Sequence, residues 1–231
     1  MFKFVAVAAV SLLAMGSAQA ADLIINEPIA QVAFTDAGFD WTGFYAGLNG
    51  AYASGQATAV GSVTGVTTSP SISGGLIGGT VGYNAQFDSF VLGVEGDVAW
   101  SGVTGSAACS ANPIYDCRGT LDWLGTIKAR AGVAVDSILF FGTAGLAAGG
   151  TTTTVTPAAP GLTNNFSGVM TGWTVGAGVE LAVTEAISIK AEYAYVDLGS
   201  LEAPAGTLSG GEATNLSAIN HLAKVGVNFH F

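Results

Sequence analysis

The residues of this chain whose types and spacing could do chemistry are charged side chains at alternate positions within apolar runs. Lys and Arg together number only 6 in 231 residues, against 16 Asp and Glu, so each basic residue needs an explanation. Such groups could pass protons or ions along a path, or neutralise one another in a polar core. The charged residues predicted to share one inner face are Glu95, Asp97, Asp122, Lys128, Arg130, Glu180, Lys190, Glu192 and Lys224.

Their positions along the predicted strands indicate which charges meet. A hairpin at 183–187 would place Glu180 directly opposite Lys190, a favourable cross-strand pair. Glu95 and Asp97 lie at heights along the barrel similar to those of Lys128 and Arg130 on the neighbouring strand. We therefore expect ion pairs that fill the interior, because eight strands enclose a space that side chains just fill.

Other chemistry finds little support in the sequence. There is no G-x-S-x-G or H-E-x-x-H motif, so we expect no enzyme and no catalytic, cofactor or metal site. His221 and His230 have opposite parity on the last strand and cannot share a ligand. No basic patch exists for nucleic acid.

Cys109 and Cys117 are the two cysteines, and both fall in one predicted loop. In an exported protein they are expected to form a disulfide. Closing so short a loop would stabilise the fold by roughly 2–3 kcal/mol. A metal site is the alternative, although no His lies nearby.

The element that indicates the architecture is the last stretch, 221–231. Apolar and aromatic residues occupy its odd positions, and mostly small or polar residues occupy the even ones, as in a strand. An exposed apolar strand at a chain end would invite pairing with other chains, and closing a barrel removes that edge. An apolar outside with a polar inside is typical of a barrel in lipid.

Turns and loops give the strand count. Three tight connections, at 86–90, 135–138 and 183–187, alternate with four longer stretches rich in Gly, Ser, Thr and Ala. This alternation predicts an all-β fold, an eight-stranded antiparallel transmembrane β-barrel of the up-and-down type with short turns and four longer outer loops. The predicted strands are 41–55, 72–87, 90–102, 119–134, 138–150, 169–183, 187–199 and 217–231.

Parity also assigns the outward faces. Aromatic residues near the loop ends should form a girdle at the lipid headgroups, namely Trp100, Trp123, Trp173 and Tyr195. Phe residues gather near the turn ends. The strand at 138–150 fits least well, because Leu139 and Phe141 point inward if Phe140 points outward.

The first twenty residues, 1–20, have the features of a secretory signal peptide. Lys3 precedes an apolar run, and Ala18 and Ala20 are suited to cleavage. An N-terminal core helix is the alternative. Residues 21–40 show no sustained period and are expected to be a periplasmic lead-in, leaving 41–231 for the barrel.

Composition agrees with a strand-built membrane protein. Charged residues are 10%, Gly numbers 34 and mean hydropathy is +0.53. No apolar run of the mature chain approaches the ~18 residues that a helical span needs. In a lipid-facing strand only every second residue needs to be apolar. This accounts for a high mean hydropathy without long apolar runs. A soluble β-sandwich is the alternative.

Three features together resemble the small outer-membrane β-barrel family of Gram-negative bacteria. They are the final strand ending on Phe231, the leader, and the opening W-T-G-F-Y-x-G at 41–47. That opening is most similar to the alphaproteobacterial 25/31-kilodalton outer-membrane (RopB-type) proteins. The resemblance covers 41–231 and implies that Phe229 and Phe231 belong to the signal read by the barrel assembly machinery.

The resemblance implies a location in the outer membrane and a surface or structural role in envelope integrity. The expected partners are outer-membrane lipid and lipopolysaccharide, the assembly machinery, and a host or environmental ligand at the outer loops. Two alternatives stay open: a small-solute porin, and a surface binder of haemin or a host receptor. The neutral Ser, Thr and Gly loops give no basis for choosing a ligand.

Overall fold

The structure is a computed structural model that describes residues 38–110, 115–157, 163–208 and 212–231. The predicted signal peptide at 1–20, its cleavage residues Ala18 and Ala20, and nearly all of the lead-in lie outside the described residues. Within the described ranges, no helix is long and apolar enough to cross a membrane.

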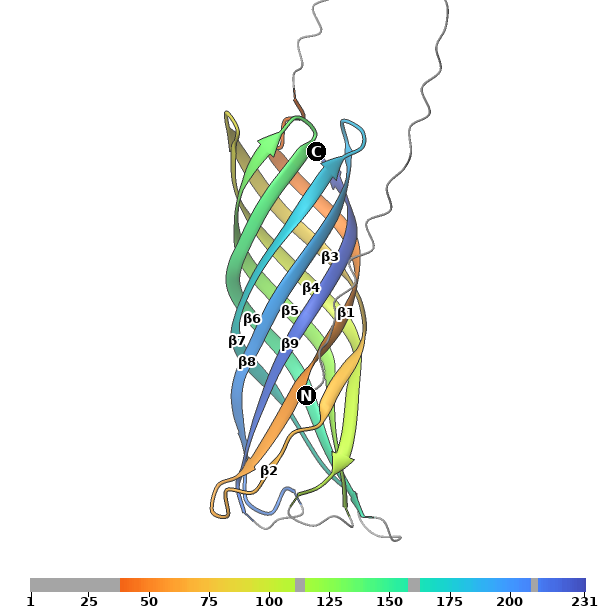
Figure 1. Ribbon diagram of the computed structural model, residues 1–231, viewed down its shortest axis with the longest axis vertical. Coiled ribbons are helices and arrows are strands. Elements are labelled where there is room, and N and C mark those ends of the chain that lie inside the picture. Colours follow the sequence, from red (N-terminus) through yellow and green to blue (C-terminus); the bar gives the residue numbers. More distant parts are fainter. Residues whose placement is uncertain (1–37, 111–114, 158–162, 209–211) are drawn as a thin grey trace, which may run out of the picture. The chain divides into compact units, whose positions relative to one another are not determined.

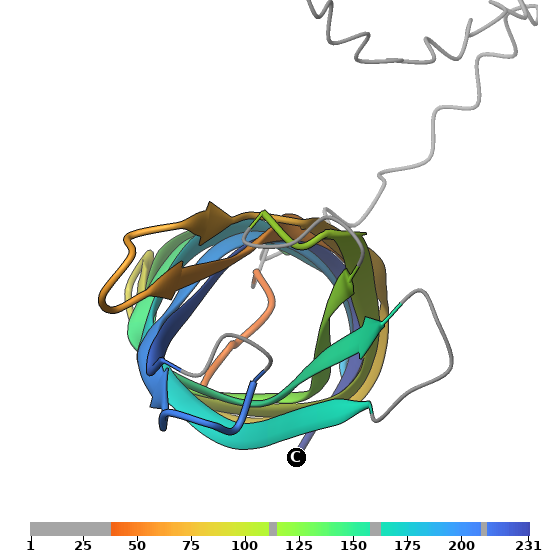
Figure 2. The same ribbon diagram turned by 90° about the horizontal axis from the view of Figure 1, so that it is seen from below.

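Eight long antiparallel strands close into a barrel, as predicted (Figures 1 and 2). Each pairs with the next along the chain, and β1 pairs with β9 to complete the ring. A ninth strand, β2 (Thr67–Thr68), only extends the loop after β1 and pairs with that strand's end. The long strands are β1 (Gly43–Gly61), β3 (Ser71–Phe87), β4 (Phe90–Ala108), β5 (Tyr115–Val135), β6 (Ile138–Pro157), β7 (Asn164–Ala182), β8 (Ile187–Ala203) and β9 (Thr214–His230).

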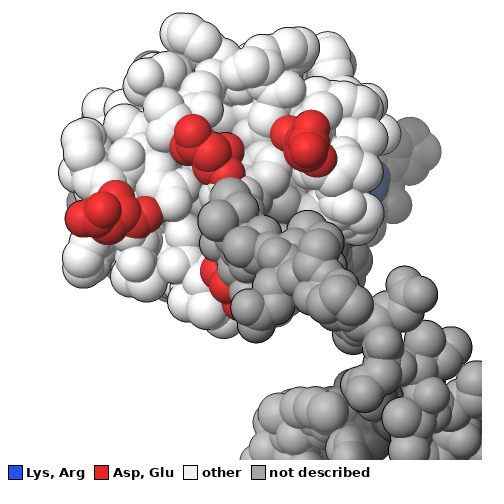
Figure 3. Space-filling model, turned by 90° about the horizontal axis from the view of Figure 1, so that it is seen from above, with Lys and Arg blue, Asp and Glu red and all other residues white. Residues whose placement is uncertain are grey.

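The three tight turns are where the sequence predicted them, at one end of the barrel, here called the turn end. Asp88 and Asp136 start two of these turns with positive φ of 54° and 53°. Asp tolerates this left-handed conformation better than most residues, which explains its place there. In the third turn the Val183 N–H donates to the Ile187 carbonyl at 2.8 Å. Acidic side chains accordingly mark this end of the molecule (Figure 3).

The opposite end, here called the loop end, differs from the prediction. Most strands run several residues further than expected, so that β6 ends at Pro157 instead of residue 150 and β1 at Gly61 instead of residue 55. The stretches read as loops because of their Ser, Thr and Gly content continue the ladder instead. Thr is β-branched and suits a strand, so composition alone misplaced these boundaries.

The outward faces are apolar, as the parity of the strands predicted. Leu48, Ile127 and Trp100 are 75%, 72% and 72% exposed in the isolated barrel. Exposure of this kind along a full ring of strands is costly in water and is accommodated in lipid. The predicted girdle residues Trp100, Trp123, Trp173 and Tyr195 all lie on this surface, where the rings of Trp173 and Tyr195 pack at a tilt with their centroids 5.3 Å apart.

Three register shifts interrupt the ladders towards the loop end. They lie in β4 after Trp100, in β5 between Leu121 and Trp123, and in β8 after Asp197. In β5 the extra residue lets Leu121 and Leu124 both face inward. A bulge shifts the alternation of inward and outward residues by one position. A prediction that continues the same odd–even pattern past the bulge therefore assigns residues to the wrong face.

The interior is packed in successive layers, which the order of residues along each strand reveals. Nearest the turn end is an apolar plug made of Trp41, Val91, Leu139 and Phe141. Charged residues follow, then a second apolar layer that includes Ile72, Leu121, Leu124, Leu198 and Leu222. Beyond it, small and apolar residues line the interior of the loop end.

Trp41 explains the strand that fitted least well. It was predicted to begin the first strand, but β1 begins at Gly43, and Trp41 enters the lumen, where its side chain is 0% exposed. Leu139 and Phe141 face inward because they pack in the same cluster as this indole. The opening aromatic of the sequence motif thus belongs to the interior, not to the lipid face.

Phe231 should matter for assembly. Its N–H donates to the Phe44 carbonyl at 2.9 Å beside the β1–β9 seam, and its ring is 83% exposed. We expect Phe231→Asp, or deletion of this residue, to lower the amount of folded barrel several-fold. Heat-modifiable gel mobility of membrane fractions measures this amount. Phe231→Tyr keeps the aromatic ring and should assemble normally, and equal folded amounts of all variants would contradict the prediction.

Candidate functional site: an ion network in the lumen

Eight charged side chains meet in the middle of the barrel and form what is here called the ion network. Four are carboxylates and four are cations, so the network is neutral when all are ionised. Its members are Glu95, Asp97, Lys128, Arg130, Glu180, Lys190, Glu192 and Lys224. All face inward, and none of their side chains is more than 9% exposed. Such burial is tolerated only because every charge has partners of opposite sign.

Lys128 joins three carboxylates. Its Nζ lies 3.0 Å from Glu95, 3.0 Å from Asp97 and 2.8 Å from Glu192. Glu95 is its direct cross-strand partner on β4, whereas Glu192 belongs to β8 on another part of the ring. This single ammonium group therefore links strands that do not pair with each other.

Of the remaining pairs, Lys190–Glu95 and Lys224–Asp97 cross the lumen, whereas Lys224 and Glu192 are direct cross-strand partners on β9 and β8. Lys190 of β8 contacts Glu95 of β4 at 2.7 Å. Lys224 of β9 contacts Asp97 at 3.1 Å and Glu192 at 3.5 Å. Because the Lys190–Glu95 and Lys224–Asp97 contacts span the interior, they hold the two sides of the barrel together.

Glu180 does not pair with Lys190 as predicted, whereas Arg130 lies 3.9 Å from Glu95 on the neighbouring strand, as their similar heights indicated. Glu180 is indeed opposite Lys190 in the β7–β8 ladder, but its carboxylate pairs with Arg130 of β5. Lys190 turns to Glu95 instead. The guanidinium also lies over the Phe141 ring, 4.0 Å from its centroid, in a cation–π contact. Correct register thus gave the wrong partner, because a narrow lumen lets a long side chain reach across.

Asp122 does not belong to the network, contrary to the prediction. It lies in the β5 bulge, is exposed, and accepts a hydrogen bond from the Thr152 hydroxyl at 2.8 Å. The bulge reverses its parity, which turns the carboxylate outward. Its absence from the lumen is consistent with neutrality, since a fifth carboxylate would have no fifth cation.

Neutral side chains, most of which sequence reasoning missed, complete the network. The Tyr45 hydroxyl donates to Glu95 at 2.8 Å, and the Thr143 hydroxyl donates to Glu192 at 3.1 Å. The Asn228 amide donates to Glu180 at 2.6 Å, while His230 and Ser188 share a hydrogen bond of 2.9 Å. All lie at inward parity, and that shared parity was the signal that could have identified them.

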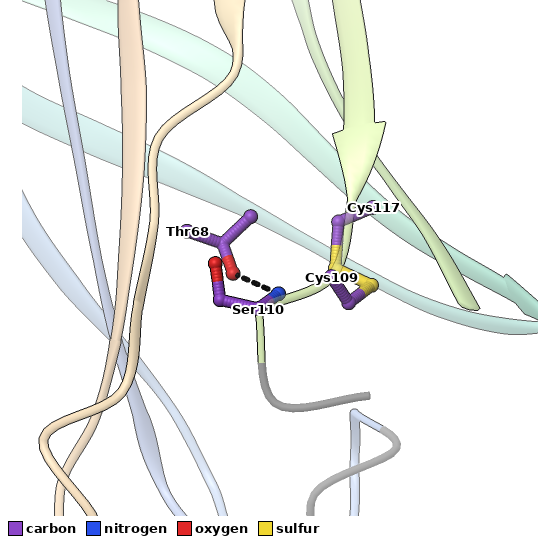
Figure 4. The surroundings of a disulfide bond; sticks show 4 residues. All are labelled: Thr68, Cys109, Ser110 and Cys117. Carbon is purple, nitrogen blue, oxygen red and sulfur yellow. Dashed lines mark hydrogen bonds between the residues drawn. A yellow bond between two sulfur atoms is a disulfide. The ribbon is translucent and has the colours of Figure 1, made fainter. Parts of the chain in front are cut away.

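At the loop end, Cys109 and Cys117 form the predicted disulfide, with their Cα atoms 5.2 Å apart (Figure 4). The bond joins the end of β4 to the start of β5. Next to it the Ser110 N–H donates to the Thr68 hydroxyl at 2.9 Å, which ties this loop to β2. Among the described residues, no group of three or more potential ligands is placed to hold a metal ion.

The disulfide should protect both thiols. On intact cells, a membrane-impermeant maleimide should leave Cys109 and Cys117 unlabelled until a reductant is added, as read by mass spectrometry. In Cys109→Ser the remaining thiol should react without reductant, which shows that the reagent reaches this loop. Immediate labelling of the unreduced native protein would show that the bond does not form there.

Removing one member of a central ion pair should cost stability. Arg130→Met leaves Glu180 without its cation, and breaking a buried pair costs about 3–5 kcal/mol. Arg130→Met combined with Glu180→Gln should recover much of that loss. The free energy of unfolding in lipid vesicles, from urea titration, measures both effects. Arg118→Met removes an exposed cation outside the network as a control, and equal losses for the two single variants would contradict the expected role of the network.

Comparison of the sequence with known proteins identifies the family of this chain. The model of the outer membrane protein beta-barrel domain matches residues 6–231. The chain is 35% identical to the 31 kDa outer-membrane immunogenic protein of Brucella melitensis, over 99% of this chain and 100% of that protein. It is 32% identical to a 22 kDa outer membrane protein of Rhizobium leguminosarum, over 69% of this chain and 65% of the relative.

Among solved structures, the fold is similar to that of the outer membrane protein OprG from Pseudomonas aeruginosa. That match covers 84% of this chain and 99% of the other, at 16% identity and a TM-score of 0.49. The match to the family model and the full-length relative show both family and location: this chain belongs to the outer-membrane β-barrel protein family and is itself a protein of the outer membrane.

Proposed function

We propose that this protein is a closed, non-conducting barrel that contributes to envelope integrity and presents its loop end for surface interactions. The observation that carries the proposal is the ion network, which fills the lumen between two apolar layers. An open pore would leave space between the walls, whereas here the opposing walls are joined by direct side-chain contacts. The role is structural and non-enzymatic.

The orientation follows from the general plan of outer-membrane barrels. Short turns face the periplasm and longer loops face the outside of the cell, so the acidic turn end would lie on the periplasmic side (Figure 3). The apolar outward faces would contact membrane lipid and, in the outer leaflet, lipopolysaccharide. The barrel assembly machinery is the proposed partner during insertion, and nucleic acid is not a proposed partner.

A role in surface interactions is supported by the fixed geometry of the loop end. The disulfide and the Ser110–Thr68 bond hold two adjacent outer segments together. Glu212, before β9, accepts hydrogen bonds from the Val63 and Thr64 N–H groups at 2.6 Å and 3.0 Å. A preorganised surface loses less conformational entropy on binding than a flexible one.

Conductance distinguishes the closed barrel from the small-solute porin. Purified protein in a planar bilayer should show no steady ohmic conductance. Replacing Lys128, Arg130 and Lys190 together with Ala should raise conductance and lower thermal stability, because their carboxylates lose their partners. Arg118→Ala, outside the network, should change neither. A steady, large, single-level conductance of the unmodified protein would overturn the closed-lumen proposal and favour a porin.

A further inference from the structure

The polarity of the barrel wall reverses towards the loop end. Along the central part, outward positions are apolar and inward positions carry the charges. At the start of β5 the order is opposite, since Tyr115 and Cys117 face inward while Asp116 and Arg118 are exposed. On β6, Val155 is buried inside, and its neighbour Thr156 is exposed. The wall that meets water is polar, and the wall that faces the lumen is apolar.

This apolar inner wall surrounds a cavity of about 440 Å³, here called the outer cavity. Its volume is within the range of about 300–1,000 Å³ that is typical of ligand pockets. Ala57 lines it and also packs against the second apolar layer, so the cavity rests directly on that layer. Its apolar walls include Ala59, Cys109, Tyr115, Val155, Leu208 and Leu216.

The polar residues of the outer cavity are mainly neutral threonines, namely Thr58, Thr64, Thr68, Thr153 and Thr214. Thr68 and Thr153 contribute hydroxyl groups to its lining. Arg118 is part of the lining, but its side chain is exposed and donates to Thr104 of β4 at 3.0 Å. The cavity thus offers threonine hydroxyl groups for hydrogen bonds together with apolar contact.

Two charged residues of opposite sign line the cavity and leave the described lining without net charge: Arg118, which donates to Thr104, and Glu212. Hydrogen bonds from Thr64, through its hydroxyl and its N–H, and from the Val63 N–H lower the pKa of this carboxyl, so it stays ionised over most of the pH range. An anionic ligand would be repelled by this carboxylate. A cationic ligand would have to compete with the hydrogen bonds that both oxygens already accept.

We infer that the outer cavity binds a small, uncharged and mostly apolar molecule taken from the external medium. Transfer of apolar surface from water into such a site is favourable, at roughly 25 cal/mol per Å² buried. The second apolar layer and the ion network lie beneath the cavity, so the site retains the molecule rather than passing it through. The inference rests on the proposed surface role, to which it adds a ligand class.

The test uses the full barrel in lipid nanodiscs and the neutral probe para-trifluoromethylbenzyl alcohol, followed by fluorine NMR. Empty nanodiscs give the non-saturable partitioning of the probe into lipid. The protein should add a saturable component, and Ala59→Trp, which fills the outer cavity, should weaken it by about tenfold or more. Val60→Trp is the matched control: Val60 is the next residue of β1, pairs with Thr67 and Asn215, and is not part of the cavity lining.

Each outcome decides one point. Binding lost in Ala59→Trp and kept in Val60→Trp, with both variants showing native heat-modifiable mobility, supports the outer cavity. Signals identical to those of empty nanodiscs, or equal loss in both variants, overturn it. Stronger binding of para-trifluoromethylbenzoate than of the alcohol overturns the neutral ligand class. Conductance of the same samples is measured separately, so failure of this site and failure of the closed barrel are distinguishable.

Discussion

The constraint on which this structure depends is charge neutrality inside a narrow barrel. Eight strands enclose a space that side chains just fill, and a lone charge buried there costs several kcal/mol. Four carboxylates meet four cations in the lumen. Each cation contacts a carboxylate on a strand that does not pair with its own strand. The polar interior is therefore a cross-brace between the walls of the barrel.

The layers above and below the network follow from the same constraint. Apolar layers on both sides keep water from the ion pairs and so strengthen their attraction. On the turn-end side, the apolar layer includes Trp41, which precedes β1 in the chain and has its side chain in the lumen. On the other side, Leu121 and Leu124 contribute to the second layer because a bulge lets both face inward. The free-energy cost of burying the charges is offset because every charge has a partner of opposite sign within one layer of the lumen, and because apolar side chains pack on both sides of that layer.

Beyond the second apolar layer, the barrel wall serves a different environment. The strands extend past the apolar outer belt, and there the polar side of each strand turns to water. The inner face there is largely apolar, and it is bordered by a frame made of the disulfide and the Glu212 hydrogen bonds. This frame borders the outer cavity, for which we infer ligand binding.

The sequence by itself determined the strand order, the tight turns, the outward apolar faces, the disulfide and most of the charges that share the lumen. These depend on period two, local turn chemistry and composition, all of which act between residues close along the chain. The tertiary structure alone decided which charge pairs with which, the exclusion of Asp122, the inward position of Trp41 and the outer cavity. Each of these depends on a bulge or on contacts across the lumen, which bring together residues that no local pattern relates.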